Sequence, residues 1–172
     1  IEACNKALRI NTTTPGEYFL IEYRRGTGWD AGIGGSGVVV YHVDRSDNLA
    51  GSMTAAMRWN ANAVNCCASH PCVYAVNVRD SKKVEDVFYP GSGDVTQINS
   101  FANIPLLSWS GEGTCIGIDS IANSVRDYAE FTVIDDSGWD IPFAEDCIME
   151  VDQHQAILKW RSKSTSARWE IL

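Results

Sequence analysis

The stretch that decides the fold is Glu17-Tyr18-Phe19-Leu20-Ile21-Glu22-Tyr23-Arg24, followed after a glycine-rich connection by Val38-Val39-Val40-Tyr41-His42-Val43. In the first segment Phe19, Ile21 and Tyr23 alternate with the residues between them, which is the period of a β-strand. The second segment is β-branched and aromatic throughout, as is typical of a strand buried on both faces. Two such strands joined by a glycine-rich loop are expected to pair antiparallel.

Short segments of the same kind recur along the chain and are separated by turn sequences rich in Gly and Pro. Only Leu49 to Asn62 suggests a helix, because Leu49, Met53 and Met57 recur at a spacing of four. Many short strands with few helices predict an all-β fold, an antiparallel sandwich or a jelly-roll-like domain. The further expected strands are Lys6–Ile10, Val73–Val78, Ile116–Ile121 and Tyr128–Ile134.

Composition limits the classes of partner. The chain has 172 residues, with 14 basic and 22 acidic side chains, a formal net charge of −8 and 45% hydrophobic residues. An acidic chain without clustered Lys and Arg is a poor nucleic-acid binder, because phosphate neutralisation needs basic side chains. No run approaches the ~18 apolar residues of a transmembrane helix. We therefore expect neither nucleic-acid binding nor a membrane span.

The chain is expected to comprise one β-rich domain and the start of a second module. We place the first domain at residues 1–135, a linker at 136–146 and the second module at 147–172. In this last part Ala156, Leu158 and Trp160 alternate before a short polar turn, which resembles the opening strands of a fibronectin type III module. Such a sandwich needs roughly 100 residues, so this module is expected to be truncated and the chain to be a piece of a longer protein.

One polar cluster is suggested by the two deciding strands. His42 lies on one of them, and Glu22 and Arg24 lie on the other. Cross-strand pairing brings such side chains within reach, so an autonomous enzyme using these three groups is one hypothesis. The competing interpretation, which we prefer, is a histidine satisfied by polar neighbours at a strand end. No H-E-x-x-H sequence is present, so we expect no catalytic residue and no zinc-protease helix in this chain.

The loop after the second strand offers oxygen ligands for a cation. Asp44, Asp47 and Asn48 follow one another closely there, which suits the oxygen coordination of calcium. The loop lacks the glycine and the terminal Glu of an EF-hand, and turns favour such residues for their own reasons. Calcium is thus a candidate ligand, with a simple polar turn as the alternative.

The cysteines concentrate in Cys66-Cys67-Ala68-Ser69-His70-Pro71-Cys72. Three thiolates and one imidazole are a ligand set for zinc, but adjacent cysteines chelate poorly and structural zinc sites prefer C-x₂₋₄-C spacing. An even total of six cysteines is typical of an exported protein with disulfides. We therefore predict a disulfide from Cys66 or Cys67 to Cys72 and no metal at this site.

Several segments form an ordered set of motifs over about residues 15 to 134: Glu17–Arg24, Gly28-Trp29-Asp30, Gly35–Asp44, Trp59–Asn65 with His70-Pro71, Phe88–Gly91, Trp109–Gly111, and Ile118–Ile121 with Phe131. Taken in this order, they resemble the later part of the immune inhibitor A-like family of secreted metalloproteases. The resemblance departs from the family at Tyr23, where that family commonly has Asn, and in the cysteine cluster.

The resemblance implies a parent zinc endopeptidase that is secreted, periplasmic or held at the cell surface and acts on polypeptides. In that family the zinc ligands and the general base lie on an H-E-x-x-H helix that precedes all of these segments in the chain, and zinc activates a water there. This chain would then be a non-catalytic β-domain that packs against the missing catalytic half and shapes its cleft. Alone, it is expected to be inactive and to need no cofactor.

A function of another class is an extracellular adhesion or glycan-binding module. Aromatic rings stack on sugars when their faces are exposed, and the candidates are Trp29, Trp59 and Trp109. If these rings instead fill the core, glycan binding is disfavoured.

Overall fold

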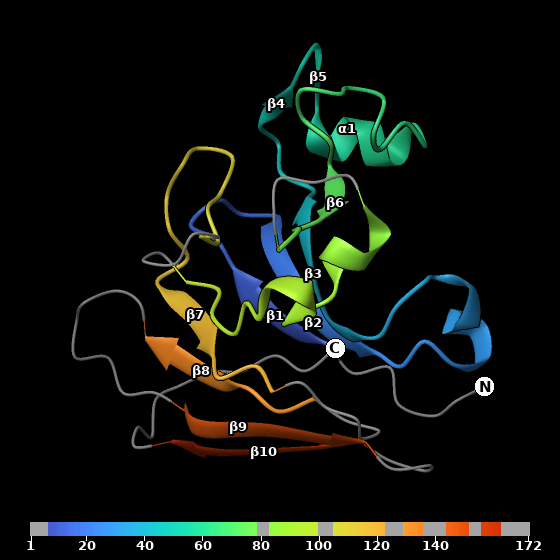
Figure 1. The fold of residues 1–172 in the computed structure, drawn as a ribbon. Helices are drawn as coiled ribbons and strands as arrows, with labels where there is room; N and C mark the ends of the chain where they lie inside the picture. Colours follow the sequence, from blue (N-terminus) through green and yellow to red (C-terminus); the bar gives the residue numbers. More distant parts are fainter. Residues whose placement is uncertain are drawn as a thin grey trace.

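A four-stranded antiparallel sheet forms the centre of the protein in the computed structural model, which describes residues 7–78, 83–99, 105–122, 129–135, 144–151 and 156–162. Its strands lie in the order β1-β2-β3-β6 (Figure 1). They comprise β1 (Leu8–Asn11), β2 (Glu17–Arg24), β3 (Gly37–Asp44) and β6 (Val73–Ala75).

The two deciding segments pair with each other along their whole length. β2 runs antiparallel to β3, with Phe19 opposite His42 and Ile21 opposite Val40. In an antiparallel pair, opposite residues point to the same face of the sheet, so these four side chains share one face. The antiparallel pairing expected from the sequence is therefore confirmed.

Besides the central sheet, the described chain has three two-stranded ladders, of which two lie in its second half. β7 (Ile116–Asp119) pairs antiparallel with β8 (Thr132–Asp135), and β9 (Ala144–Val151) pairs antiparallel with β10 (Ala156–Ser162). Figure 1 shows the β9–β10 hairpin running beside β8.

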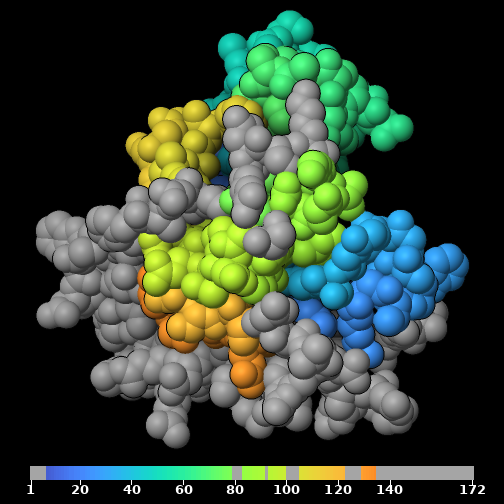
Figure 2. Space-filling view, viewed as in Figure 1, coloured from blue at the N-terminus to red at the C-terminus, as the bar shows by residue number. Residues whose placement is uncertain are grey.

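One main hydrophobic core lies between the central sheet and the β7–β8 ladder. Figure 2 shows residues 83–99 packed against residues 129–134 on one face of this core. The inward face of β2 and β3 contributes to it, because alternate side chains of each strand point the same way. Its buried members are Ile10, Phe19, Ile21, Val38, Val40, Val78, Tyr89, Ile98, Leu106, Ile118, Ile121, Ala129, Phe131 and Val133.

The predicted helix over Leu49–Asn62 is shorter than expected. Its first part is a hairpin of β4 (Leu49–Ala50) and β5 (Met53–Thr54), and the helix α1 covers only Ala55–Asn60. The Thr54 hydroxyl accepts the Met57 N–H and caps the helix, which fixes its start at this residue. The spacing of four was misleading because two of its members lie in the hairpin.

Within the described ranges, three short 3₁₀ helices lie in the connections. The glycine-rich link between β2 and β3 contains η1 (Gly28–Gly32), and the segment after β6 contains η2 (Val84–Val87) and η3 (Gly91–Gly93).

The prediction of a β-rich fold is confirmed, since the described chain consists mostly of antiparallel strands with one short α-helix. The sandwich or jelly-roll arrangement stays a prediction, as do the domain limits. Of the expected linker 136–146, residues 136–143 lie outside the described ranges, and the last three residues begin β9. No helix in the described part of the chain has the length and apolar character to cross a membrane.

Alkaline pH is expected to destabilise the fold through its buried tyrosines. Tyr89 is 1% exposed, its hydroxyl donates to the Val76 carbonyl, and burial raises its pKa. Burial, together with the Glu22 carboxylate, raises the pKa of Tyr41 to about 12. In the unfolded chain the tyrosines titrate near pH ~10, so above that pH unfolding releases their protons. The stabilisation that these tyrosines provide is fully present below pH ~10 and is lost as the pH rises above it.

We expect Tyr89 alone to contribute up to about 1.4 kcal/mol of this loss per pH unit above its unfolded pKa. Urea unfolding at pH 8, 9, 10 and 11 measures the slope for the wild type and for Tyr89→Phe. A slope that is the same in both proteins would exclude Tyr89 as its source.

Candidate functional site

A buried carboxylate and a buried histidine meet where β2 begins and β3 ends. His42 Nε2 lies 2.7 Å from Glu17 Oε1 and donates to it, and the two side chains are 2% and 1% exposed. The same oxygen accepts the backbone N–H of Trp109 at 2.6 Å. Glu17 therefore connects the central sheet to a loop 92 residues further along the chain.

The second ring nitrogen of His42 contacts a tyrosine on the neighbouring strand. Tyr74 of β6 lies opposite His42 in the register of the sheet, and its hydroxyl is 2.9 Å from Nδ1. Burial, followed by the negative charge of Glu17, raises the pKa of Tyr74. Because the Tyr74 side chain remains partly exposed, it connects the buried pair to the protein surface.

A second acid–histidine pair lies beside the first. His70 Nε2 is 2.7 Å from Asp44 Oδ2, while Asp44 Oδ1 accepts the Ser46 N–H at 2.8 Å. The Asp44 carbonyl accepts the Trp59 indole N–H at 2.6 Å. Asp44 is 1% exposed, and its hydrogen bonds hold the loops around the end of β3.

Trp109 joins the two pairs by ring contacts. Its ring stacks on His70 with centroids 3.9 Å apart, and it lies 5.7 Å from the His42 ring at a similar angle. His42 stacks in turn on Phe19 of the core, at 4.4 Å. We name the partly exposed side chains Tyr74, His70 and Trp109 the aromatic surface; Figure 2 shows residues 105–115 lying beside the 45–70 region there.

The polar cluster predicted from Glu22, Arg24 and His42 does not form as one group. Arg24 contacts Glu22 at 2.6 Å and Asp30 at 2.8 Å, on the sheet face opposite His42. The register pairs Glu22 with Val39, whose side chain points away from His42 because successive residues of β3 alternate. The carboxylate that His42 binds is Glu17 instead.

The three candidate calcium ligands differ in burial and in hydrogen bonding. Both carboxylate oxygens of Asp44 are already hydrogen-bonded, whereas Asp47 and Asn48 are exposed in the following loop. Calcium binding by these three residues stays a prediction. Among the described residues, no three His, Cys, Asp or Glu side chains come together in a way that would hold a metal ion.

The structure has Cys66, Cys67, Cys72 and Cys115 as free thiols, so the predicted bridge to Cys72 is not present in it. Cys72 is buried, and burial raises its pKa. The loop that carries Cys66 and Cys67 is closed by Asn65, whose side chain bonds to both the N–H and the carbonyl of Val73.

The three candidate sugar-stacking tryptophans differ in exposure. Trp29 is 94% exposed, in η1. Trp59 is partly buried and its ring is covered by the Arg45 guanidinium at 4.5 Å. Trp109 is 36% exposed and stacks on His70. Only Trp29 of these three keeps a largely exposed ring.

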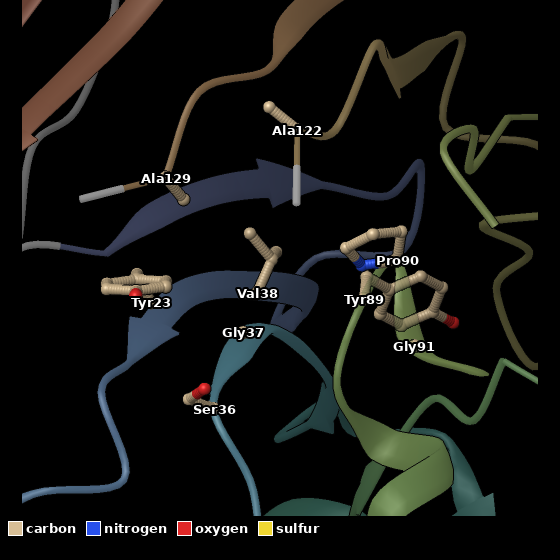
Figure 3. Close-up of a pocket in the computed structure, with 9 residues that line it drawn as sticks. All are labelled: Tyr23, Ser36, Gly37, Val38, Tyr89, Pro90, Gly91, Ala122 and Ala129. Atoms are coloured by element: carbon tan, nitrogen blue, oxygen red, sulfur yellow. The ribbon is translucent and has the colours of Figure 1, made fainter. Parts of the chain in front are cut away.

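A small pocket of about 130 Å³ lies where β2 ends and β3 begins, at the opposite end of this strand pair from His42. Figure 3 shows Tyr23 at one end of it and the Tyr89–Pro90 turn at the other, with Ala122 and Ala129 along one side. Its described lining offers the Ser36 hydroxyl and no carboxylate or basic side chain, so we assign it no chemistry.

Sequence reasoning missed Glu17 and the role of Trp109. Glu17 is the first residue of the alternating segment and lies on its apolar face, and a charged group in that position is a signal of a buried partner. Trp109 gave no such signal, because its contacts depend on a loop that returns from far along the chain. The arrangement contains two acid–histidine pairs, and the Trp109 ring joins them.

The chain matches no protein-family model, and comparisons with curated proteins and with solved structures give no significant match.

Proposed function

We propose that this chain is the non-catalytic, β-rich part of a secreted zinc metalloendopeptidase, and that it packs against the catalytic half through the aromatic surface. One observation supports the proposal. Residues from four separate motifs of the family resemblance meet in a single contact network: Glu17, His42 with Asp44, His70, and Trp109.

The physical character of this surface suits a protein interface. Tyr and Trp dominate the binding energy of interfaces, since they offer a large apolar area with few rotatable bonds. Here Asp44 holds the His70 ring and His42 holds the Tyr74 hydroxyl, while Glu17 accepts the backbone N–H of Trp109. Little conformational entropy therefore remains to be lost on docking. Zinc and its activated water would belong to the other half, and this chain would contribute rigidity and one wall of the cleft.

Truncating the aromatic surface is expected to weaken docking strongly. The test uses the parent chain encoded by the gene: its upstream part is expressed separately and titrated with this 172-residue chain by calorimetry. We expect Trp109→Ala to weaken binding by at least about tenfold, as for an interface hot spot. Trp29→Ala is the matched control, because that ring is far more exposed and lies in η1, and we expect it to bind like the wild type.

The parent itself must also meet two requirements. The full-length protein should bind one zinc ion and hydrolyse a polypeptide such as casein, while this chain alone should do neither. A parent without an H-E-x-x-H sequence or bound zinc would overturn the proposal, and so would docking that Trp109→Ala leaves unchanged.

A second candidate function, glycan binding, is favoured by the 94% exposure of Trp29. A freely exposed indole offers its ring faces for stacking on a sugar. Saturable binding of a soluble glycan that disappears in Trp29→Ala but persists in Trp109→Ala would favour this function over the first.

A further inference from the structure

Arg58 is a buried cation whose charge is not balanced by a carboxylate among the described residues. Its side chain lies in α1 and is 4% exposed, and its Nε has no hydrogen-bond partner. A guanidinium stays charged at every ordinary pH, and a buried charge is costly unless an opposite charge or strong acceptors compensate it. The group that Arg58 contacts directly is a sulfur atom: Cys66 Sγ lies 2.6 Å from Nη1.

A second sulfur, that of Cys67, lies near the same guanidinium. Gly51, in the β4–β5 turn, lies next to both groups. A Cβ atom added to this glycine would lie 2.8 Å from Arg58 Nη2 and 3.1 Å from Cys67 Sγ. Gly51 has a φ of +82° and no side chain, so the turn leaves room for both groups. The positive charge of Arg58 thus contacts the Cys66 thiol directly and lies near the Cys67 thiol.

Cys67 has further groups that stabilise its thiolate. Its sulfur lies 3.3 Å from the Ser69 hydroxyl. The pKa of Cys67 is lowered by this hydrogen bond first, then by the backbone N–H groups of Ser69 and His70 and by the charge of Arg58. Cys72 differs, since burial raises its pKa and makes it a poor nucleophile.

We propose that Cys67 is a thiol–disulfide exchange site that is modified by low-molecular-mass disulfides, with Arg58 and Ser69 holding its reactive thiolate. This inference does not depend on the proposed function. The reactive form of cysteine is the thiolate, and reactive cysteines lie in electropositive, partly exposed surroundings, as Cys67 does here.

The exchange balances without any other reagent. The Cys67 thiolate attacks one sulfur of the small disulfide, and a new S–S bond forms to Cys67. The original S–S bond breaks, and its electron pair leaves on the second sulfur as a thiolate, which takes a proton from water. Cys67 is thereby oxidised and the small disulfide is reduced to one thiol, which is free in solution.

The test uses the reduced 172-residue chain and glutathione disulfide over pH 6 to 9. Released glutathione is measured with time, and tandem mass spectrometry of peptides locates the modified cysteine. We expect Cys67 to react about tenfold faster than Cys115 at pH 7, and its rate to rise at lower pH than that of Cys115. Cys115 is the matched control, because it is an exposed thiol in another part of the fold.

Variants separate the proposal from a merely structural role of the cluster. Cys67→Ser should abolish the fast release of glutathione, whereas Cys66→Ser should keep it. Ser69→Ala removes an exposed hydroxyl without disturbing the core, and it should move the pH–rate profile of Cys67 upward. The proposal is overturned if Cys66 or Cys115 reacts as fast as Cys67, or if the Cys67 profile is unchanged in Ser69→Ala.

Discussion

Replacing Glu17 by alanine is expected to lower the free energy of unfolding by about 3–5 kcal/mol, the cost of removing one partner from a buried acid–histidine pair. The substitution leaves His42 Nε2 and the Trp109 N–H without their shared acceptor, in a place where water does not reach. Each buried polar group left unsatisfied costs about 1–3 kcal/mol. The loop that carries Trp109 would lose its anchor as well.

Glu22→Ala is the control for this experiment. Glu22 lies on the same strand but on the other face, and it pairs with the partly exposed Arg24. A pair of this kind contributes at most about 1 kcal/mol. Urea unfolding of both variants at pH 7 gives the comparison, and equal losses of stability would contradict the role assigned to Glu17.

Replacing Ile118 by alanine is expected to cost about 2–5 kcal/mol, as for other fully buried aliphatic side chains. Ile118 is 0% exposed and lies in β7, and its N–H and carbonyl both bond to Ile98. The cavity would open in the core between the central sheet and the β7–β8 ladder, where close packing leaves little freedom to collapse.

Leu107→Ala serves as the comparison, because Leu107 is of similar size but 38% exposed. We expect it to cost less than about 1 kcal/mol. If Ile118→Ala proves as mild as Leu107→Ala in chemical unfolding, the core does not lie where the structure places it.

The strands of the central sheet were predictable from local pattern, since alternation along Glu17–Arg24 and the β-branched run in β3 both survive in the structure. The extent of the helix was not, because the pattern did not reveal that Leu49 and Met53 belong to a hairpin. Periodicity reports which side chains can share a face, but not which element carries them.

The site was predictable only in part. His42 and Asp44 were recognised from the sequence, but their partners depend on the register of β2 against β3. A shift of one residue would have turned Glu22 toward His42 and Glu17 away from it. His70 and Trp109 join through loops, and no local signal in a single sequence specifies such contacts.

The hydrogen bond between Glu17 and the Trp109 N–H has a consequence for the order of folding. The two bonded residues are 92 positions apart in the sequence, so bringing them together costs a large amount of chain entropy. β2 and β3 can form their hairpin before that contact exists, but His42 and Glu17 would then still be open to water on one side. We therefore expect the burial of the Glu17–His42 pair to be completed only when the loop at Trp109 docks on the sheet.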